Sequence, residues 1–551
     1  MLTIEELAAV PLFAKLPHDQ LVQLAGKAAD VQLATGEYAV HEGEERALFA
    51  VIAGKIEVTK RFDGVERTIG WRAPGQIFGE VPIALGGAFL GSYRAAESSR
   101  VVRLDPRQYY AVAAAFPAIS EAVGALARER IGGLQGLAAE PQKAKATILG
   151  HRWDPYCHDL RRFLARNQIT FDWVTPDDAG LAAQWHAPRP DDATLPALML
   201  ADGTTLFRPQ PREVAQRLGL QTRCSAEGYD TIIVGAGPAG LAAAVYGASE
   251  GLRTLVVERE APGGQAGTSS RIENYLGFPN GVSGDELATR ALSQARRLGA
   301  EILVTRNIER VDPSTHTVVL DDGEAVRART VILATGVAWR RLAIDGFERF
   351  IGKGIYYGAA RSEASNTQGI DVCLIGAGNS AGQAALFFAS YARTVTLLVR
   401  GDALEKSMSH YLIDQVRAKK NVQVLLQTEV AAVHGDGHLT AVDVAERPGG
   451  AVSRRDCGAL FVFIGADAQT QWLPPAIARD DHGYVLTGTD AARDSRWPRK
   501  RDPYLLETSV PGIFACGDVR KSPVKRVASA VGEGSMAIAF VHQYLGERQT
   551  G

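Results

Sequence analysis

The sequence predicts a multidomain α/β protein with a β-rich N-terminal part, and three observations support this. First, the chain has 551 residues, enough for roughly three to five domains of 100–200 residues each. Second, residues 1–140 alternate short apolar runs with turn residues after a short helical opening, as in a small β-barrel or jelly roll. Third, residues 229–246 and 370–391 each run from an apolar strand through a glycine-rich turn into a helix, the order of a doubly wound unit.

The bulk composition is that of an ordinary globular protein and indicates no charged partner. The formal net charge is −2 and the isoelectric point is about 6.6, so the chain has no overall electrostatic bias towards nucleic acid or an anionic membrane. No apolar run is long enough to span a bilayer, and the N-terminus lacks the apolar core of a signal peptide. We therefore expect a cytoplasmic protein with neither a membrane nor a nucleic-acid partner.

The cysteines argue against three kinds of site. They are scattered, odd in number and nowhere spaced as Cys-x-x-Cys: Cys157, Cys224, Cys373, Cys457 and Cys516. Such a set is not typical of a disulfide framework, a zinc site or a local dithiol pair. We therefore expect no bound metal and no redox pair of neighbouring cysteines.

Short motifs in residues 1–140 resemble the cyclic-nucleotide-binding domain of the catabolite activator family. The matching segments are Pro11-Leu12-Phe13, Gly36-Glu37, Glu42-Gly43 and Phe78-Gly79-Glu80. The resemblance implies that the turn at Gly79 presents backbone N–H groups to a cyclic phosphate, and that Glu80 accepts a hydrogen bond from the ribose. It therefore implies a nucleotide-like ligand for this domain.

One position departs from that family pattern. The family places an arginine, usually after proline, a few residues beyond the glutamate, whereas this chain has Phe89 there. A buried phosphate without that guanidinium loses a charge-assisted bidentate contact. Two interpretations stay open, a competent cyclic-nucleotide site and a degenerate or differently liganded docking module, and we favour the second.

The pattern of residues 142–222 predicts a small α/β domain. A strand at 146–150 is followed by Asp154-Pro155-Tyr156-Cys157 and a helical pattern. The block resembles a glutaredoxin-like thioredoxin fold, with Pro196 at the family's cis-proline. Asp154 replaces the family's first cysteine, the low-pKa nucleophile, and an aspartate cannot attack a disulfide. We interpret the domain as structural or as a docking remnant, with thiol chemistry at Cys157 as the alternative.

The strongest single motif is the Gly-x-Gly-x-x-Gly turn between the strand and the helix of residues 229–246. In such a turn the first glycine permits the bend, the second lets a pyrophosphate approach, and the third lets helix and strand pack closely. The helix N-terminus supplies N–H donors, and a strand ending in an acid about 20 residues on can bind ribose hydroxyls. The predicted binding residues are Gly235, Gly237, Pro238, Ala239, Gly240 and Glu258.

Separated motifs from residue 228 onwards resemble the low-molecular-weight, bacterial-type thioredoxin reductases. The resemblance implies a discontinuous FAD-binding domain, 226–345 and 465–551, around an NAD(P)H-binding domain, 346–464. It also implies a homodimer.

In that family the FAD site draws on five further segments. The segments at 262–265 and 272–275 lie on the flavin side, and the segment 331–336 closes the first half of the FAD domain. An aspartate at 518 binds the ribityl chain, and a helix opening near 525 directs its amides at the flavin pyrimidine. The residues so implied are Gly264, Gln265, Asn274, Ala334, Thr335, Gly336, Gly517, Asp518, Lys525, Arg526 and Val527.

The second glycine turn, which the pattern follows with a helix from Gln383 to Tyr391, predicts the NAD(P)H site. The following strand leads into a basic residue rather than an acid, which suits a 2′-phosphate better than a bare ribose diol. The family has two adjacent arginines there, but the second is Gly401 here, so we expect NADPH with NADH as the alternative. The predicted residues are Gly376, Gly378, Asn379, Ser380, Ala381 and Arg400.

The chain departs from the reductase pattern where that family has its redox-active Cys-x-x-Cys. Gly358 and Arg361 occupy the two cysteine positions, so no dithiol there can accept electrons from the flavin. No side chain is clearly placed as a catalytic acid or base, and the catalytic residues stay unassigned.

Three functions follow as hypotheses. We favour an FAD-dependent NAD(P)H oxidoreductase whose flavin passes electrons directly to an unidentified small-molecule or protein acceptor, with regulation by the N-terminal domain. The alternatives are a disulfide reductase that uses cysteines of a partner, and a non-catalytic redox or ligand sensor.

Overall fold

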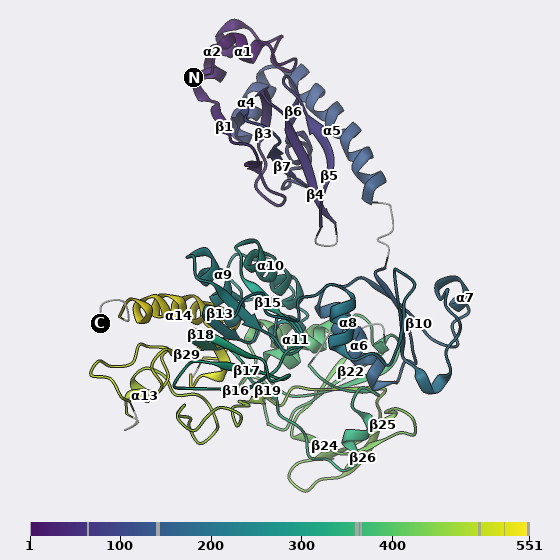
Figure 1. The fold of residues 1–551 in the computed structure, drawn as a ribbon. Helices are drawn as coiled ribbons and strands as arrows, with labels where there is room; N and C mark the ends of the chain where they lie inside the picture. Colours follow the sequence, from purple (N-terminus) through teal and green to yellow (C-terminus); the bar gives the residue numbers. More distant parts are fainter. Residues whose placement is uncertain are drawn as a thin grey trace. The chain divides into compact units, whose positions relative to one another are not determined.

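The computed structural model describes residues 2–62, 65–138, 144–358, 363, 366–493, 497–522 and 524–547 (Figure 1). The chain divides into two compact units, Met1–Lys143 and Ala144–Gly551. The first contains the β-rich N-terminal domain. The second contains the small α/β domain and both domains with glycine-rich turns.

The N-terminal unit has two four-stranded antiparallel sheets, which confirms the predicted β-barrel or jelly-roll class. One sheet has the order β1 (Ala29–Leu33), β8 (Ser99–Leu104), β3 (Leu48–Ala53), β6 (Ile77–Phe78). The other has the order β2 (Tyr38–Val40), β7 (Ser92–Ala95), β4 (Ile56–Phe62), β5 (Val65–Arg72). Apolar side chains from both sheets form one shared core, with Phe49 and Val58 among them.

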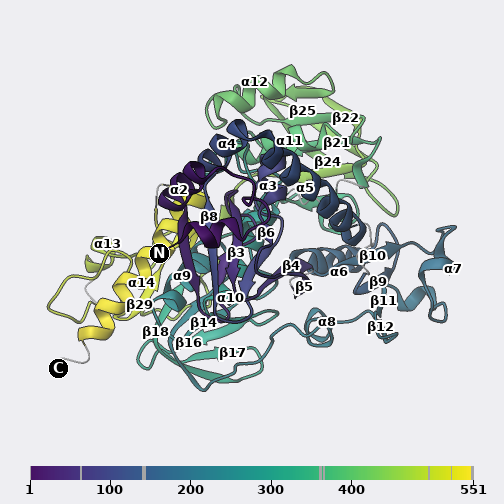
Figure 2. The same ribbon diagram turned by 90° about the horizontal axis from the view of Figure 1, so that it is seen from above.

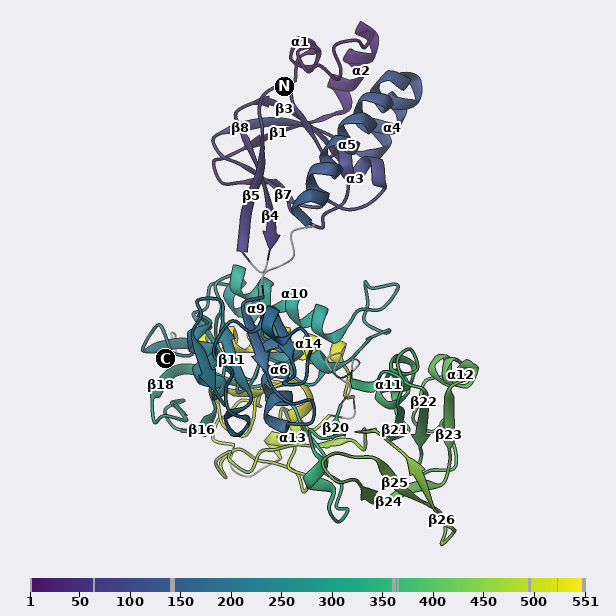
Figure 3. The ribbon, with the colours of Figure 1, turned by 90° about the vertical axis from the view of Figure 1, so that its right-hand side faces the viewer.

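Helices cover one end and one side of this sandwich, and α5 runs along the side in Figure 3. The predicted helical opening is present as α1, where the Thr3 side chain and Glu6 form a capping box. The helices of the described part of this unit are α1 (Ile4–Ala8), α2 (His18–Lys27), α3 (Glu80–Leu85), α4 (Pro106–Ala115) and α5 (Pro117–Ala138).

The small α/β domain has a mixed four-stranded sheet of order β10-β9-β11-β12. β9 and β10 are parallel and are joined through α6, while β11 and β12 form an antiparallel hairpin. The Leu195–Pro196 peptide bond is cis, as the glutaredoxin-like pattern predicts. The elements are β9 (Ala146–Leu149), α6 (Pro155–Arg166), β10 (Phe171–Val174), α7 (Leu181–Gln184), β11 (Ala197–Leu200), β12 (Thr205–Phe207) and α8 (Pro211–Arg217).

The first doubly wound sheet has the order β15-β14-β13-β18-β17-β16, and β29 pairs with β18. β29 begins 180 residues after the end of β18, its partner in the sheet, so the C-terminal segment completes this sheet. Apolar cores lie on both of its faces. The elements are β13 (Gly228–Val234), α9 (Pro238–Ser249), β14 (Thr254–Val257), α10 (Gly284–Arg297), β15 (Glu301–Leu303), β16 (Ile308–Val311), β17 (Val318–Leu320), β18 (Ala325–Leu333), α13 (Thr489–Ala492), β29 (Ile513–Ala515) and α14 (Val527–Glu547).

The second doubly wound sheet is parallel, with the order β20-β27-β21-β22-β23, and a three-stranded antiparallel sheet β24-β25-β26 accompanies it (Figure 2). The helix after its glycine turn begins at Asn379, four residues before the predicted start at Gln383. The elements are β20 (Ile355–Tyr357), β21 (Asp371–Ile375), α11 (Asn379–Phe388), β22 (Thr394–Leu398), α12 (His410–Ala418), β23 (Val422–Leu425), β24 (Thr428–His434), β25 (Ala441–Glu446), β26 (Val452–Asp456) and β27 (Ala459–Val462). A two-stranded ribbon of β19 (Ala338–Trp339) and β28 (Ala466–Asp467) joins the segments that connect the two domains.

Helices α9 and α14 pack with their backbones in close contact. A Cβ on Gly534 would lie 2.1 Å from the carbonyl oxygen of Ala239, and a Cβ on Gly517 would lie 2.9 Å from the Ala239 Cβ. Only glycine fits at both positions without a shift of backbone. The C-terminal helix is therefore held directly against the helix that follows the first glycine turn.

This packing predicts different effects on the free energy of unfolding when two glycines of α14 are replaced by alanine. Gly534→Ala should lower the free energy of unfolding by about 1–3 kcal/mol, the usual size of overpacking in a core. Gly532→Ala adds a Cβ with no heavy atom within 4 Å, so it should be neutral or stabilise by up to about 1 kcal/mol. Urea unfolding midpoints of the two variants measure the difference, and equal destabilisation would contradict the close contact.

Candidate functional site

The first glycine turn brings the strand and helix backbones into contact. Gly235 follows β13 with a φ of 101°, which favours glycine. A Cβ on Gly240 would lie 1.9 Å from the Gly235 carbonyl oxygen, so the third glycine of the motif is required by close packing. Gly237 precedes Pro238, the first residue of α9, and the nearest atom to its added Cβ is Gly264 Cα at 3.9 Å. The start of α9 is therefore open enough for a pyrophosphate to approach its free N–H groups.

Glu258 follows β14 and joins the strand end to the glycine turn. Its Oε2 accepts from the Ala236 N–H at 2.8 Å, and its Oε1 accepts from the Glu260 N–H at 2.9 Å. Burial raises the pKa of Glu258, and these two donors oppose the rise. A carboxylate has about four acceptor positions, so both oxygens can still accept from a ribose diol.

The first glycine turn, Glu258 and the loop 259–265 that follows it lie together and form the candidate site called the first cradle. The loop forms one wall of it. The Gly263 N–H donates to the Ala236 carbonyl at 2.8 Å, and a Cβ on Gly264 would lie 3.0 Å from Gly237 Cα. The side chain of Gln265 donates to the Val337 carbonyl at 2.5 Å, which ties the loop to the segment after β18. Asn274 is exposed, whereas Glu258, Gly263, Gly264 and Gln265 are buried or partly buried.

The other predicted FAD residues come from the end of β18 and from the C-terminal segment. Ala334 is buried, and Thr335 and Gly336 are partly buried beside the turn. The Gly517 N–H donates to the Glu533 carboxylate at 2.7 Å. The Lys525 ammonium donates to the Asp518 carbonyl at 2.8 Å.

The electrostatics of this C-terminal segment suit a polar ligand. Burial raises the pKa of Asp518, and Lys525 and Arg526 oppose the rise. Burial lowers the pKa of Lys525, and Asp518 opposes that fall. Arg526 precedes Val527, the first residue of α14, so the free N–H groups of this helix start lie next to the charged cluster. The donors, acceptors and glycine clearances of the whole cradle fit FAD.

The second glycine turn repeats the arrangement. Gly376 has a φ of 142°, and its added Cβ would lie 2.5 Å from the Phe463 carbonyl oxygen. Gly378 precedes α11, and a Cβ there would meet no heavy atom within 4 Å. Asn379 accepts from the Ser409 N–H at 2.8 Å, which holds the loop before α12 next to the turn.

The remaining predicted residues of this second site are Ser380, which is exposed, Ala381, which is buried, and Arg400, which is exposed two residues after β22. The open start of α11 and a basic residue at the end of the next strand fit a dinucleotide that carries an extra phosphate.

The segment at the position of the family's Cys-x-x-Cys lies beside the first doubly wound domain. Gly358 has a φ of 85°, and a Cβ there would be 3.5 Å from both Thr268 Oγ1 and the Trp339 ring. Arg361 lies outside the described residues. Tyr356, just before this segment, is buried against Phe461, and burial raises the pKa of its hydroxyl.

The small α/β domain contacts this second doubly wound domain through the first turns of α6. The His158 ring lies 5.2 Å from the Tyr356 ring, and its Nδ1 is 3.1 Å from Glu363 Oε1. The Trp153 ring stacks on the His438 ring at 4.7 Å with an interplanar angle of 4°. These contacts were not predicted, since single aromatic and acidic residues give no sequence signal for a partner far along the chain.

The last turn of the same helix contacts the first doubly wound domain. Arg162 and Arg166 both form ion pairs with Glu260, at 2.8 and 2.9 Å. Val304 also joins the apolar core of the small domain. The small domain therefore bridges the two nucleotide-type domains.

The thiol of Cys157 is enclosed by its own domain. A Cβ on Gly150 would lie 2.7 Å from the Cys157 Sγ and 3.0 Å from Pro196, and Cys157 is fully buried. Burial raises the pKa of Cys157 to about 12. Asp154 does not act as a nucleophile but caps α6, where it accepts from the Tyr156 N–H at 2.9 Å. The geometry favours the structural interpretation of this domain.

Cys224, Cys457 and Cys516 are also poor thiolate sources. Cys373, Cys457 and Cys516 are buried, and Cys224 is partly buried. Burial raises the pKa of Cys224 to about 12 and raises those of Cys457 and Cys516.

In the N-terminal unit the predicted ligand residues take part in internal contacts. Gly79 precedes α3, and a Cβ there would lie 2.0 Å from the Ala47 carbonyl oxygen. Glu80 is buried, and its Oε2 lies 2.7 Å from the guanidinium of Arg130 on α5. Arg130 could not be predicted as the partner of Glu80, because a helical arginine 50 residues away is usually a surface residue.

Phe89 is also part of the sandwich core. Its ring packs edge-on against Phe49 and Tyr93, and the residue is 2% exposed. A buried aromatic ring thus stands where the family's phosphate-binding arginine is expected.

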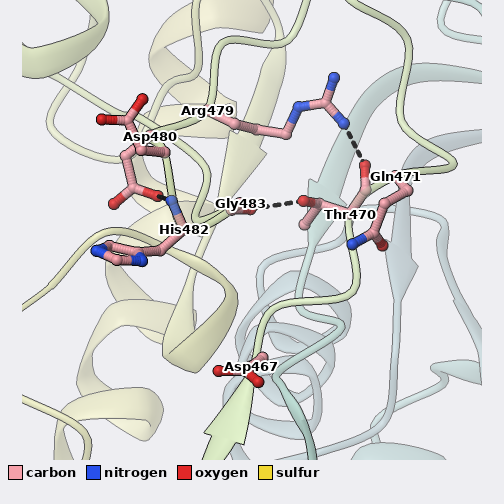
Figure 4. Close-up of a pocket in the computed structure, with 8 residues that line it drawn as sticks. Asp467, Thr470, Gln471, Arg479, Asp480, His482 and Gly483 are labelled. Atoms are coloured by element: carbon pink, nitrogen blue, oxygen red, sulfur yellow. Dashed lines mark hydrogen bonds between the residues drawn. The ribbon is translucent and has the colours of Figure 1, made fainter.

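A polar cavity of about 420 Å³ contains none of the predicted site residues (Figure 4). Thr470 Oγ1 donates to the Gly483 carbonyl at 2.5 Å, and the Arg479 guanidinium donates to the Thr470 carbonyl. The His482 N–H donates to the Asp480 carboxylate at 3.0 Å. These bonds close a loop beside the β19–β28 ribbon, and the cavity is a surface feature of that loop.

Residues 229–534 match the family model for pyridine nucleotide-disulphide oxidoreductases. The chain belongs to this family. It is therefore an FAD-dependent NAD(P)H oxidoreductase, and the matched residues include both glycine turns. Residues 30–115 match the model for cyclic nucleotide-binding domains, which confirms the predicted class of the N-terminal domain.

Two relatives and one solved structure each match 58% of this chain. A thioredoxin reductase of Mycolicibacterium smegmatis is 33% identical over 58% of this chain and 97% of its own length. A 34.2 kDa protein of the rubredoxin operon of Clostridium pasteurianum is 31% identical over the same shares. The solved structure of Lactococcus lactis thioredoxin reductase is 27% identical, with a TM-score of 0.52 over 58% of this chain and 99% of that one.

Among the described residues, no group of histidine, cysteine and acidic side chains is arranged to hold a metal ion. No described helix combines the length and hydropathy needed to cross a membrane.

Proposed function

We propose that this chain passes electrons from NAD(P)H, through FAD, directly to an acceptor outside the chain. The observation that carries the proposal is the state of the cysteines: no two are spaced as Cys-x-x-Cys, and four of the five are buried. A buried thiol with a raised pKa supplies almost no thiolate at neutral pH, and the thiolate is the reactive form in disulfide exchange. The thiols of Cys373 and Cys457 interact with each other, but both are buried, so the chain has no exposed dithiol of its own to relay electrons.

The residues of the two cradles have distinct tasks in this proposal. The N–H groups at the start of α9 bind the pyrophosphate of FAD, and Glu258 accepts from its ribose. The start of α14, with Lys525 and Arg526, faces the flavin pyrimidine and favours negative charge there. The start of α11 binds the NAD(P)H pyrophosphate, and Arg400 faces the 2′-phosphate. FAD supplies the step from a two-electron hydride donor to one- or two-electron acceptors.

The proposed acceptors are a quinone, a small oxidant, oxygen, or a carrier protein such as ferredoxin or flavodoxin. A second candidate is a disulfide reductase that uses the cysteines of a partner, and the thioredoxin reductases among the relatives favour it. Both candidates require reduction of the flavin by NAD(P)H, which a purely non-catalytic sensor does not. As in the reductases it resembles, we propose that the chain forms a homodimer.

Anaerobic titration with NADPH tests the catalytic proposal. The absorbance of the bound flavin in the visible range should fall with about one equivalent of NADPH, because hydride transfer reduces the flavin. A thioredoxin-coupled assay then separates the two candidates: turnover of small acceptors without turnover of thioredoxin is expected. Rapid reduction of thioredoxin would contradict direct electron transfer from the flavin to a small acceptor. A flavin that stays oxidised would favour the non-catalytic sensor.

Substitution of Arg400 tests the choice of nucleotide. Arg400→Ala should raise the KM for NADPH by about tenfold and leave the KM for NADH within about twofold, since only NADPH carries the 2′-phosphate. Arg417→Ala is the matched control, because this exposed arginine pairs with Glu405. Steady-state kinetics with both nucleotides give the result. Equal changes for the two nucleotides would remove Arg400 from the phosphate site.

We further propose that the N-terminal unit is a docking or regulatory module rather than a cyclic-nucleotide receptor. Its buried Phe89 and the Glu80–Arg130 pair support this. Titration of residues 1–143 with cyclic AMP and cyclic GMP should show no sub-micromolar binding, as measured by calorimetry. Tight binding would reinstate the nucleotide site.

If the unit regulates turnover, the turnover rates of the full chain and of a chain that starts at Ala144 should differ.

A further inference from the structure

Arg166, the last residue of α6, extends from the small α/β domain to the loop that walls the first cradle. Its Nη1 forms the ion pair with Glu260. Its Nη2 donates to the carbonyls of Ala261 and Gly264, at 2.9 and 3.2 Å. One side chain therefore satisfies three acceptors on five consecutive residues of the loop.

Two consecutive glycines of this loop have left-handed backbone conformations. Gly263 and Gly264 have φ values of 106° and 55°, and glycine adopts such conformations at the expense of chain entropy. From inside the cradle, the loop is held by Glu258 and by the Gly263 N–H bond to Ala236. From outside, Arg166 holds the carbonyls. A shift of the loop would move Gly264 against Gly237, where the pyrophosphate is proposed to bind.

The energetics of Arg166 favour a fixed position. Its side chain is 15% exposed, and burial lowers the pKa of its guanidinium while Glu260 and Glu258 oppose that fall. A largely buried guanidinium is costly unless it is paired, and its planar donors suit several acceptors at once. Burial tends to raise the pKa of Glu260. Arg162 and Arg166 have the larger, opposite effect, so the pKa of Glu260 is lowered.

We propose that Arg166 is a positioning residue for the FAD site, so that the small α/β domain is part of the flavin-binding structure. The proposal rests on the assignment of residues 235–264 to FAD made above. It gives this domain a function that needs no thiol: its helix α6 carries the guanidinium that sets the loop. Removal of the side chain weakens FAD binding without contact to the cofactor itself.

Arg162 provides a matched control. It lies one turn earlier on α6 and pairs with the same Glu260, and no bond from it to a loop carbonyl is found among the described residues. Glu260→Gln separates the contributions further, because it removes both ion pairs and leaves the carbonyl bonds of Arg166. The carbonyl bonds and the ion pair can thus be tested apart.

The test is titration of the full-length apoprotein with FAD, followed by quenching of flavin fluorescence. Arg166→Ala should raise the FAD dissociation constant by about tenfold, the size expected for lost charge-assisted hydrogen bonds. Arg162→Ala and Glu260→Gln should stay within about threefold of the wild type. Arg166→Lys should bind FAD with intermediate affinity, since an ammonium reaches fewer of the three acceptors. Melting temperatures of the apoproteins should be similar for the Arg162→Ala and Arg166→Ala variants.

Two results would overturn the proposal: wild-type affinity in both Arg166 variants, or equal losses for Arg166→Ala and Arg162→Ala. If Arg166→Ala fails to fold, the comparison of Arg166→Lys with Arg162→Ala decides in the same way. A wild-type chain that binds no FAD would instead overturn the flavin assignment, which keeps the two failures distinct.

Discussion

The contact between the backbones of Gly235 and Gly240 is the constraint on which the rest of the catalytic region depends. It sets α9 so close to the end of β13 that a Cβ on Gly240 would lie 1.9 Å from the Gly235 carbonyl oxygen, and it leaves the N-terminus of α9 open. Helix α14 then packs on α9 through Gly534, which brings the C-terminal segment to the same turn. Two parts of the chain that are about 280 residues apart meet in one cradle because no side chain stands between them.

The small α/β domain has the cis-proline and the helix that the glutaredoxin-like pattern predicts, but its thiol is not accessible. Asp154 caps the helix, and Cys157 is enclosed beneath Gly150 and Pro196. What the domain presents to its surroundings is the surface of α6. The first turn of that helix faces the NAD(P)H domain and the last turn faces the FAD domain, so a change in their relative orientation must break contacts at one end.

The N-terminal unit has kept its scaffold in a comparable way. The strand order and the turn at Gly79 preserve the family architecture, while Glu80 is satisfied by Arg130 of α5 and Phe89 fills the core. The acid expected to bind the ribose is already paired, and a buried ring stands where the phosphate-binding guanidinium is expected.

The sequence by itself determined the fold class, the two glycine turns and the missing dithiol, because glycine spacing and cysteine spacing are local properties of the chain. The start of α11 was misplaced by four residues, since helical periodicity is weak in the alanine- and glycine-rich run from Asn379. The sequence did not indicate Arg166, Arg130 or the burial of Phe89, and Asn274 proved to be exposed. Only the tertiary structure decided these, because the partner of a charged side chain and the depth of an aromatic ring depend on segments that are distant in sequence and adjacent in space.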